Sequence, residues 1–229
     1  MKKYQIIYAD PPWSYQDKMS GHSFSLDHEY ETQSKQWISK LPIKDIAAED
    51  CCLFLWVTSP LLDEGIKVLE DWGFKFKTVA FCWTKATKHG KDVSNLGRWT
   101  MGNVELCILG VKGAPNKWRE DKTIKQLVRA ERTVHSKKPR EVRDRIVKLL
   151  GNKSRIELFA RQKTEGWDVW GNEVECDMDL LGANDKFKNK PKELEEWEKG
   201  QEQREKIDPD HSLNYAERDA KAKALGDSL

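Results

Sequence analysis

Short apolar runs alternate with amphipathic segments along the first 160 residues of the chain. The runs are rich in β-branched and aromatic residues and predict buried strands at residues 5–9, 51–57, 76–84, 104–111 and 155–160. Helical spacing of apolar residues predicts helices at 34–46, broken near Pro42, and at 140–150. A third helix is expected from Ser59, as the N-cap, to a stop at Gly73. Strands that alternate with helices indicate an α/β domain.

The first apolar run ends abruptly at Asp10-Pro11-Pro12-Trp13. Proline has no backbone donor and a fixed φ, so the strand has to stop at Asp10. In an open α/β sheet, ligands bind in the crevice beyond the carboxyl ends of the strands. We therefore expect these four residues to lie on the rim of a ligand site.

The residue types of this turn suit a planar ring that carries an exocyclic amine. Asp10 offers an ionised acceptor, the Pro11 and Pro12 carbonyls are expected to be unused by a following helix, and Trp13 offers a flat face for stacking. Adenine is such a ring. The alternative is a plain turn that ends a strand beside a half-buried tryptophan, and the tetrapeptide alone leaves both interpretations open.

Composition narrows the picture only a little. The chain has 229 residues and a formal charge of +2, which fits one α/β domain with a tail but does not by itself indicate a nucleic-acid binder. No apolar run approaches the length of a membrane span and no signal-peptide pattern begins the sequence, so we expect a cytoplasmic protein. The five cysteines lack metal-ligand spacing, and we interpret them as core thiols and assign no metal.

Several motifs, in order, resemble the MTA-type family, which is named for the seventy-kilodalton subunit of the mRNA adenosine methyltransferase. The resemblance covers roughly residues 4–173. It rests on Asp10-Pro11-Pro12-Trp13, Phe54-Leu55-Trp56-Val57-Thr58, Gly110-Val111-Lys112-Gly113, Ser136-Lys137-Lys138-Pro139, Ile156-Glu157-Leu158-Phe159-Ala160-Arg161, and Gly166-Trp167 through Gly171-Asn172. In place of the glycine-rich cofactor turn of other amino-methyltransferases, this chain has Leu158-Phe159-Ala160-Arg161, which fits the MTA type.

The resemblance implies a Rossmann-like methyltransferase fold that uses S-adenosylmethionine, with a mostly parallel sheet, helices on both faces and a circularly permuted motif order. It implies methylation of the N(6) amine of adenine in nucleic acid. DNA is favoured over RNA because compact members of the family resemble bacterial and phage enzymes. The alternatives are an RNA adenine methyltransferase, a methyltransferase of a planar amide, a non-catalytic nucleic-acid-binding subunit of a methyltransferase complex, and a structural nucleic-acid module. The oligomeric state stays open, with a homo- or heterodimer among the options.

The candidate site residues form three sets. The catalytic set is Asp10, Pro11, Pro12 and Trp13. The resemblance implies a cofactor set of Asp10, Lys112, Glu157, Arg161, Asn172 and Glu173. The substrate set consists of Trp13, of Tyr30 and Thr32, which the resemblance places near the target base, and of Arg98 from a basic loop. This loop suits a nucleic-acid strand crossing the mouth of the site, and an ordinary solvated loop is the alternative. For Glu157 and Arg161 the alternative is a structural ion pair, and for Lys112 it is a surface lysine in a turn.

The composition changes after residue 174. Residues 186–206 are dense in charge with little apolar periodicity, and a short helix-like piece follows at 214–225. We therefore predict a methyltransferase domain at 1–174 and a charged helical or disordered extension at 175–229. The extension is interpreted as solvated, with an arm for nucleic acid or a partner as the alternative.

Overall fold

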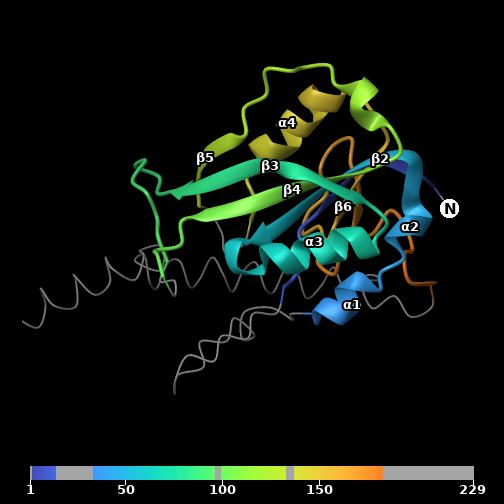
Figure 1. Ribbon diagram of the computed structural model, residues 1–229, viewed down its shortest axis with the longest axis horizontal. Coiled ribbons are helices and arrows are strands. Elements are labelled where there is room, and N and C mark those ends of the chain that lie inside the picture. Colours follow the sequence, from blue (N-terminus) through green and yellow to red (C-terminus); the bar gives the residue numbers. More distant parts are fainter. Residues whose placement is uncertain (1, 14–32, 96–98, 133–136, 183–229) are drawn as a thin grey trace, which may run out of the picture.

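The computed structural model describes residues 2–13, 33–95, 99–132 and 137–182 (Figure 1). Its centre is a seven-stranded sheet in the order β5-β3-β4-β2-β1-β6-β7. The strands are β1 (Tyr4–Ala9), β2 (Ala47–Thr58), β3 (Lys75–Ala86), β4 (Val104–Lys112), β5 (Leu127–Glu131), β6 (Arg155–Leu158) and β7 (Asp168–Trp170). β4 runs antiparallel to both of its neighbours, and the other pairs are parallel. The sheet is therefore mostly parallel, as predicted.

Helices cover both faces of the sheet, because successive side chains of each buried strand point to opposite sides. The helices are α1 (Lys35–Ser39), α2 (Ile43–Ile46), α3 (Leu62–Asp71) and α4 (Arg140–Leu150), with 3-10 turns at Ser59–Leu61 and Pro115–Trp118. Ile7 of β1 packs in one apolar cluster with residues of α1, α2 and α3. Tyr8 packs in the other with residues of α4. β1 is thus central and buried on both faces.

Most of the predicted elements are confirmed, but their ends differ. Pro42 separates α1 from α2, as expected, and Gly73 follows α3 with a φ of 84°. Ser59 is not a side-chain cap: it begins a 3-10 turn containing Pro60, and α3 starts only at Leu62. The short strands β5 and β7 were missed, because runs of five and three residues carry too little periodicity to stand out.

The folded domain continues past the predicted boundary at residue 174. Leu180 is buried in the cluster on the α3 side, and Cys176 packs against that cluster. The Asp177 backbone N–H donates to the Val169 carbonyl at 2.9 Å, and its carboxylate accepts from the Val169 N–H at 3.0 Å. Residues 175–182 therefore belong to the sheet domain. The rest of the predicted extension, 183–229, lies outside the described residues.

Among the described residues the five cysteines are unbridged, and Cys51, Cys52 and Cys107 are buried in the sheet. Cys82 and Cys176 are only partly buried, so the interpretation as core thiols holds fully for three of the five. Within the described ranges, no helix is both long and apolar enough to cross a membrane.

Candidate active site

Asp10 follows β1 directly and lies at the end of the sheet where the carboxyl ends of the parallel strands meet. Ala9 pairs with Leu55 of β2 on one side and with Leu158 of β6 on the other. Since β4 is antiparallel, its first residues reach the same end, with Glu105 opposite Thr58. The carboxyl ends of the parallel strands and the amino end of β4 therefore lie together at this end of the sheet.

Hydrogen bonds of Pro11, Pro12 and Trp13 hold the Asp-Pro-Pro-Trp turn in place. The Trp13 indole N–H donates to the Trp56 carbonyl at 2.9 Å, and the side chain is only 8% exposed. The Pro11 carbonyl accepts from the Trp13 backbone N–H at 2.8 Å, and the Pro12 carbonyl accepts from Gln33 at 2.9 Å. No helix uses the two proline carbonyls, as expected, but each accepts one backbone hydrogen bond and retains a second lone pair.

Burial of Trp13 limits what its ring can offer to a ligand. The indole packs in the cluster on the α3 side of the sheet, together with Ala9, Leu55 and Val57. Its described role is to pin the turn to the core. Stacking of Trp13 on a base remains a prediction.

Four charged side chains form a neutral cluster around Asp10. Lys138 Nζ lies 2.7 Å from Asp10 Oδ2 and 3.2 Å from Glu105 Oε2. Glu105 Oε1 in turn lies 2.5 Å from Lys85 Nζ. The Lys138 side chain is only 8% exposed, whereas Asp10 retains 27% exposure. The Asp10 carboxylate is thus fixed by the buried Lys138 ammonium, while part of it remains exposed to solvent.

The pKa shifts in this cluster follow from burial and charge. Burial raises the pKa of Asp10, although the neighbouring Lys138 ammonium opposes the shift. For Glu105 burial acts in the same sense, but Lys138 and Lys85 outweigh it and lower the pKa to about 2. Burial disfavours the charged form of Lys138, yet the two carboxylates outweigh it and raise its pKa. The cluster therefore contains a firmly ionised Lys138–Glu105 pair and an Asp10 carboxylate that is more basic than usual.

Glu157, predicted as a cofactor ligand, lies in β6 next to Tyr8. Its Oε1 accepts from Arg143 of α4 at 2.8 Å, so the alternative of a structural ion pair describes part of its role. Its Oε2 is buried and has no hydrogen-bond partner among the described residues. Burial, opposed by Arg143 and reinforced by Asp10, raises the pKa of Glu157 to about 7.

The turn after β6 and the end of β7 bring three further predicted residues together. Arg161 Nε lies 3.5 Å from Glu173 Oε1, and Asn172 stands next to Glu173 in the chain. The Ala160 N–H donates to the Trp170 carbonyl at 3.0 Å, which ties the two segments side by side. Phe159 adopts a φ of 60°, a left-handed conformation that is uncommon outside glycine, and its ring packs edge-on against Trp170.

Gly171 permits this close approach. A Cβ on Gly171 would lie 2.1 Å from the Ala160 carbonyl oxygen, which is backbone and cannot rotate away. We expect Gly171→Ala to lower the free energy of unfolding by about 2 kcal/mol or more, because the β6 turn and β7 have to separate. Urea unfolding checks this. Gly102→Ala is the matched control, since its Cβ would meet only the Asn95 carbonyl at 3.9 Å. Equal stability of the two variants would contradict the expectation.

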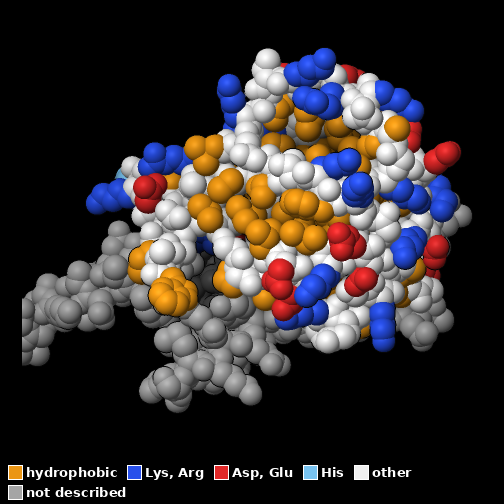
Figure 2. Space-filling view, viewed as in Figure 1, with side chains coloured by type: hydrophobic (Ala, Val, Ile, Leu, Met, Phe, Trp, Pro, Cys, Tyr) orange, Lys and Arg blue, Asp and Glu red, His pale blue; other side chains and the backbone are white. Residues whose placement is uncertain are grey.

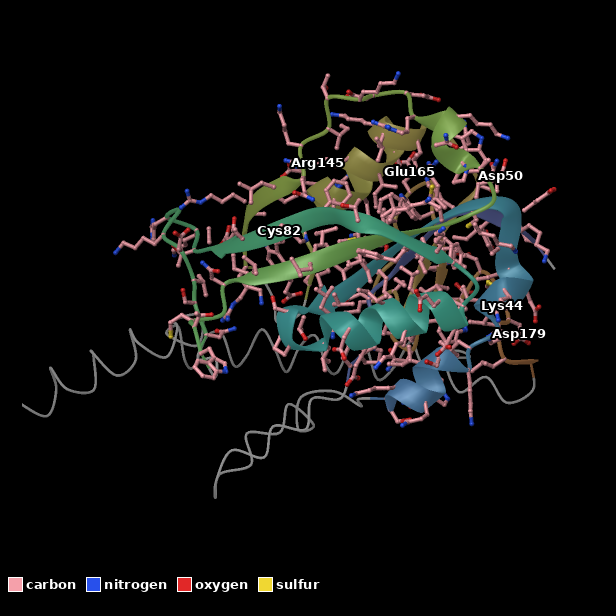
Figure 3. The ribbon with its side chains drawn as sticks, viewed as in Figure 1. Lys44, Asp50, Cys82, Arg145, Glu165 and Asp179 are labelled. Carbon is pink, nitrogen blue, oxygen red and sulfur yellow. The ribbon has the colours of Figure 1, made fainter. Side chains whose placement is uncertain are left out.

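Lys112 does not belong to this site. It lies at the far end of β4, opposite Cys51 at the beginning of the paired part of β2. The register places it near Gln5, about five residues along the sheet from Asp10, which is roughly 17 Å at ~3.3 Å per residue. Asp50, labelled in Figure 3, marks that opposite edge, where it accepts from the Ala114 N–H at 2.7 Å. The cofactor role of Lys112, which the resemblance implied, stays a prediction, and the antiparallel direction of β4 places Lys112 away from the other predicted cofactor residues.

Replacing Lys112 therefore tests this assignment. We expect Lys112→Met to leave cofactor affinity and the rate of methyl transfer within about twofold of the unmodified protein, as for a surface substitution away from the site. Isothermal titration calorimetry and a methyl-transfer assay check this. A loss of cofactor binding in Lys112→Met would mean that the edge next to Asp50 carries the cofactor.

Three residues of the site were missed as such by sequence reasoning: Lys85, Glu105 and Lys138. Lys138 stands in the motif Ser136-Lys137-Lys138-Pro139, so its presence in that motif was the available signal. Lys85 lies near the end of β3 and pairs with Glu105. Of the predicted substrate residues, Tyr30, Thr32 and Arg98 lie outside the described residues.

The mixed sheet and the site at its edge, taken with similarities to known proteins, define an α/β methyltransferase. The sequence model of the MT-A70 family matches residues 4–173, and the chain belongs to that family. It is 38% identical over 189 residues to the Type II methyltransferase M.MunI from Mycoplasma sp. The aligned region covers 76% of this chain and 78% of that protein.

More distant relatives are eukaryotic. The chain is 27% identical over 177 residues to the N(6)-adenosine-methyltransferase catalytic subunit METTL3 from Homo sapiens, covering 76% of this chain and 28% of that protein. It is 27% identical over 173 residues to the N(6)-adenosine-methyltransferase MT-A70-like protein from Arabidopsis thaliana, covering 74% of this chain and 23% of that protein. The chain thus spans about a quarter of the length of these relatives.

Proposed function

We propose that this protein uses S-adenosylmethionine to methylate the exocyclic N(6) amine of adenine in DNA. The observation that carries the proposal is Asp10, which follows the central strand β1 as the first residue of the Asp-Pro-Pro-Trp turn, pairs with Lys138 and remains partly exposed. A carboxylate in this position can accept a hydrogen bond from an amine while remaining fixed from behind.

The polar residues around Asp10, here called the rim (Asp10, Lys138, Glu157, Arg161, Asn172 and Glu173), have the chemistry to bind S-adenosylmethionine. A methionyl group carries an ammonium and a carboxylate, and a ribose carries two hydroxyls. The rim supplies acids and bases in pairs, Asp10 with Lys138 and Glu173 with Arg161. The buried Glu157 Oε2, which has no protein hydrogen bond among the described residues, is an acceptor that a ligand hydroxyl or ammonium can satisfy. We propose Asp10, Glu157, Arg161, Asn172 and Glu173 as cofactor ligands and add Lys138 to them.

The strand order supports a Rossmann-like fold with a permuted order of motifs. The strand that carries Asp10 comes first in the chain and lies in the middle of the sheet. The strand that carries Glu157 comes sixth but pairs directly with it. In this arrangement the proposed catalytic turn precedes the proposed cofactor segments in sequence while adjoining them in space.

In the proposed mechanism the protein orients a weak nucleophile. S-adenosylmethionine supplies the methyl group on a sulfonium. The Asp10 carboxylate and the second lone pair of the Pro11 carbonyl accept the two amine hydrogens, which aims the nitrogen lone pair toward the methyl group. Once the methyl group is transferred, the Asp10 carboxylate would stabilise the positive charge on the amine nitrogen, and this nitrogen would then release one proton to water.

The choice of DNA rests on the similarity to a Type II methyltransferase over most of both chains. RNA is the second candidate, because the more distant relatives are named N(6)-adenosine methyltransferases. A DNA substrate accords with a protein of the bacterial or phage-infected cytoplasm.

The decisive experiment offers the purified full chain duplex DNA, single-stranded DNA and RNA with S-adenosylmethionine labelled in its methyl group, followed by digestion to nucleosides. Label in N(6)-methyladenine from DNA is the expected result, and label from RNA alone would transfer the proposal to RNA. Cofactor binding without transfer to any of the three polymers would contradict a self-sufficient enzyme, and addition of a partner subunit would then be needed for activity.

A further inference from the structure

Trp99 is a nearly fully exposed tryptophan on the connection between β3 and β4. Its relative exposure is 98%, and Met101, two residues on, is 43% exposed. Burying an aromatic side chain of this kind typically removes about 150–250 Å² from water. An indole that the folded chain leaves in solvent is therefore well suited to a partner.

The connection that carries Trp99 begins and ends next to residues of the candidate active site. It leaves β3 just after Lys85 and returns to β4 just before Glu105, and these two residues are paired in the charge cluster of Asp10. Its base is held firmly: the Val93 N–H donates to the Lys85 carbonyl at 2.9 Å, and the Lys85 N–H donates to the Asn103 carbonyl at 3.2 Å. Val93 is buried.

The tip of the connection is closed by its own hydrogen bonds. The Asn95 N–H donates to the Gly102 carbonyl at 2.7 Å, and the Gly102 N–H donates back to the Asn95 carbonyl at 2.8 Å. Trp99 lies between these two residues in the chain. The tip is thus tied to a base that belongs to the site, while its indole stands in solvent.

The charges of the connection favour a nucleic acid over a protein as this partner. Lys88, His89 and Lys91 are exposed. The acid of the connection, Asp92, pairs with Arg129 at 3.0 Å and so does not neutralise the two lysines. Figure 2 shows the resulting group of basic side chains on the projection at the left, which Figure 1 identifies as the connection between β3 and β4. Trp99 and Met101 are exposed apolar side chains of the connection, and the described residues beside them are the polar Thr100 and Gly102, which has no side chain. A protein-docking surface would require a larger contiguous apolar patch.

Given the proposed nucleic-acid substrate, on which this inference rests, we propose that Trp99 is a stacking site for a base of the bound strand beside the reacting adenine. An adenine that reacts at N(6) in a duplex has to leave the base stack, and this unstacking costs a few kcal/mol. An aromatic side chain that stacks on an adjacent base offsets part of that cost. The lysines of the same connection hold the phosphates, which carry no sequence information.

The test compares the full chain with Trp99→Ala, Trp99→Phe and the double variant Lys88→Ala/Lys91→Ala. Dissociation constants for a fluorescein-labelled duplex DNA and the matching single strand are measured by fluorescence anisotropy at several salt concentrations. We expect Trp99→Ala to weaken binding about 5- to 150-fold, the fold-change of a lost base–aromatic stack, with an unchanged salt slope. Trp99→Phe should retain most of the affinity. The lysine variant should lower the slope of log K against log salt by about two.

Two further measurements distinguish a loss of base stacking from a damaged cofactor site and from a change in oligomeric state. Calorimetry with S-adenosylmethionine should give the same affinity for all variants, since none of the replaced residues lies in the proposed cofactor site. Analytical ultracentrifugation reports the oligomeric state. If the unmodified chain binds and methylates DNA and Trp99→Ala does so equally well, the stacking inference is wrong and the proposed function stands. If Trp99→Ala instead breaks a dimer, Trp99 is a subunit contact and the inference is overturned.

A third result concerns the proposed function itself. If the unmodified chain binds neither DNA nor RNA and transfers no methyl group, the proposed function fails and the stacking inference fails with it. The unmodified chain therefore separates the two failures before any variant is compared.

Discussion

Replacing Asp10 with alanine is expected to lower the rate of methyl transfer at least about a thousandfold, the upper end of the loss seen when one preorganised group is removed from a transition state. Alanine removes the acceptor that orients the amine and the charge that stabilises the nitrogen as it becomes cationic. The measurement is single-turnover transfer of labelled methyl to the polymer identified as substrate.

The fold should survive this change. β1 is held by apolar residues on both faces, and Lys138 keeps Glu105 as a partner when Asp10 is lost. Circular dichroism and urea unfolding check that the variant is folded. Asp63→Asn is the matched control, because Asp63 is an exposed acid of α3 that pairs only loosely with Lys67 at 3.8 Å, and it should retain full activity. Activity of Asp10→Ala within tenfold of the unmodified chain would refute the proposed role.

Replacing Lys138 with methionine should have the second largest effect, a loss of about a hundredfold or more in methyl transfer at pH 7. The stem of methionine fills much of the same space but leaves two carboxylates, Asp10 and Glu105, without their shared cation. Removing one partner of a buried ion pair typically costs about 3–5 kcal/mol of stability. Lys112→Met, the same substitution at the opposite edge of the sheet, is the matched control.

The pH dependence of Lys138→Met gives a sharper test than its rate. Burial already raises the pKa of Asp10, and Lys138 restrains that rise. Without the ammonium the pKa of Asp10 rises further, so less of the carboxylate is ionised at neutral pH. Because the proposed mechanism needs the ionised form, the acid limb of the pH–rate profile should move to higher pH, and part of the lost activity should return as the pH is raised. A profile with an unchanged acid limb would rule out this coupling.

The same substitution affects acid stability through Glu105. Its pKa is about 2, below its ordinary value of 4.5, so the folded state binds fewer protons than the unfolded state between these values. The associated stability is fully present above pH 4.5 and is lost as the pH falls through about 2. In Lys138→Met the pKa of Glu105 moves back toward its ordinary value, so acid unfolding should begin at a higher pH.

The sequence was most informative where local chemistry decides structure. The apolar run before Asp10 predicts a strand that must end there, because two prolines cannot continue it, and β1 ends at Ala9. Helix α4 occupies the predicted residues 140–150, since its apolar positions repeat on one face. For these elements the residues within one segment contain the information that determines it.

Strand direction was not readable in the same way. An apolar run such as that of β4 has the same pattern whether it runs parallel or antiparallel, and direction depends on where the chain goes before and after it. The antiparallel direction of β4 places Lys112 far from Asp10 and brings Glu105, at the other end of β4, to the site unpredicted. Lys138 likewise meets Asp10 across 128 residues of sequence. Pairings of this kind are set by tertiary structure.

The left-handed turn at Phe159 also bears on the order in which the domain assembles. A non-glycine residue in this conformation costs about 1–3 kcal/mol, which the local segment cannot recover by itself. Two contacts that offset this cost involve β7, the edge strand of the sheet: the Phe159 ring packs on Trp170, and the Ala160 N–H donates to the Trp170 carbonyl. Phe159 also packs against the apolar cluster on the α3 side. Docking of β7 therefore stabilises the turn that carries Arg161. If Arg161 and Asn172 hold the cofactor as proposed, cofactor binding would in turn favour the docked position of β7, so the stability of this edge strand should rise when S-adenosylmethionine is added.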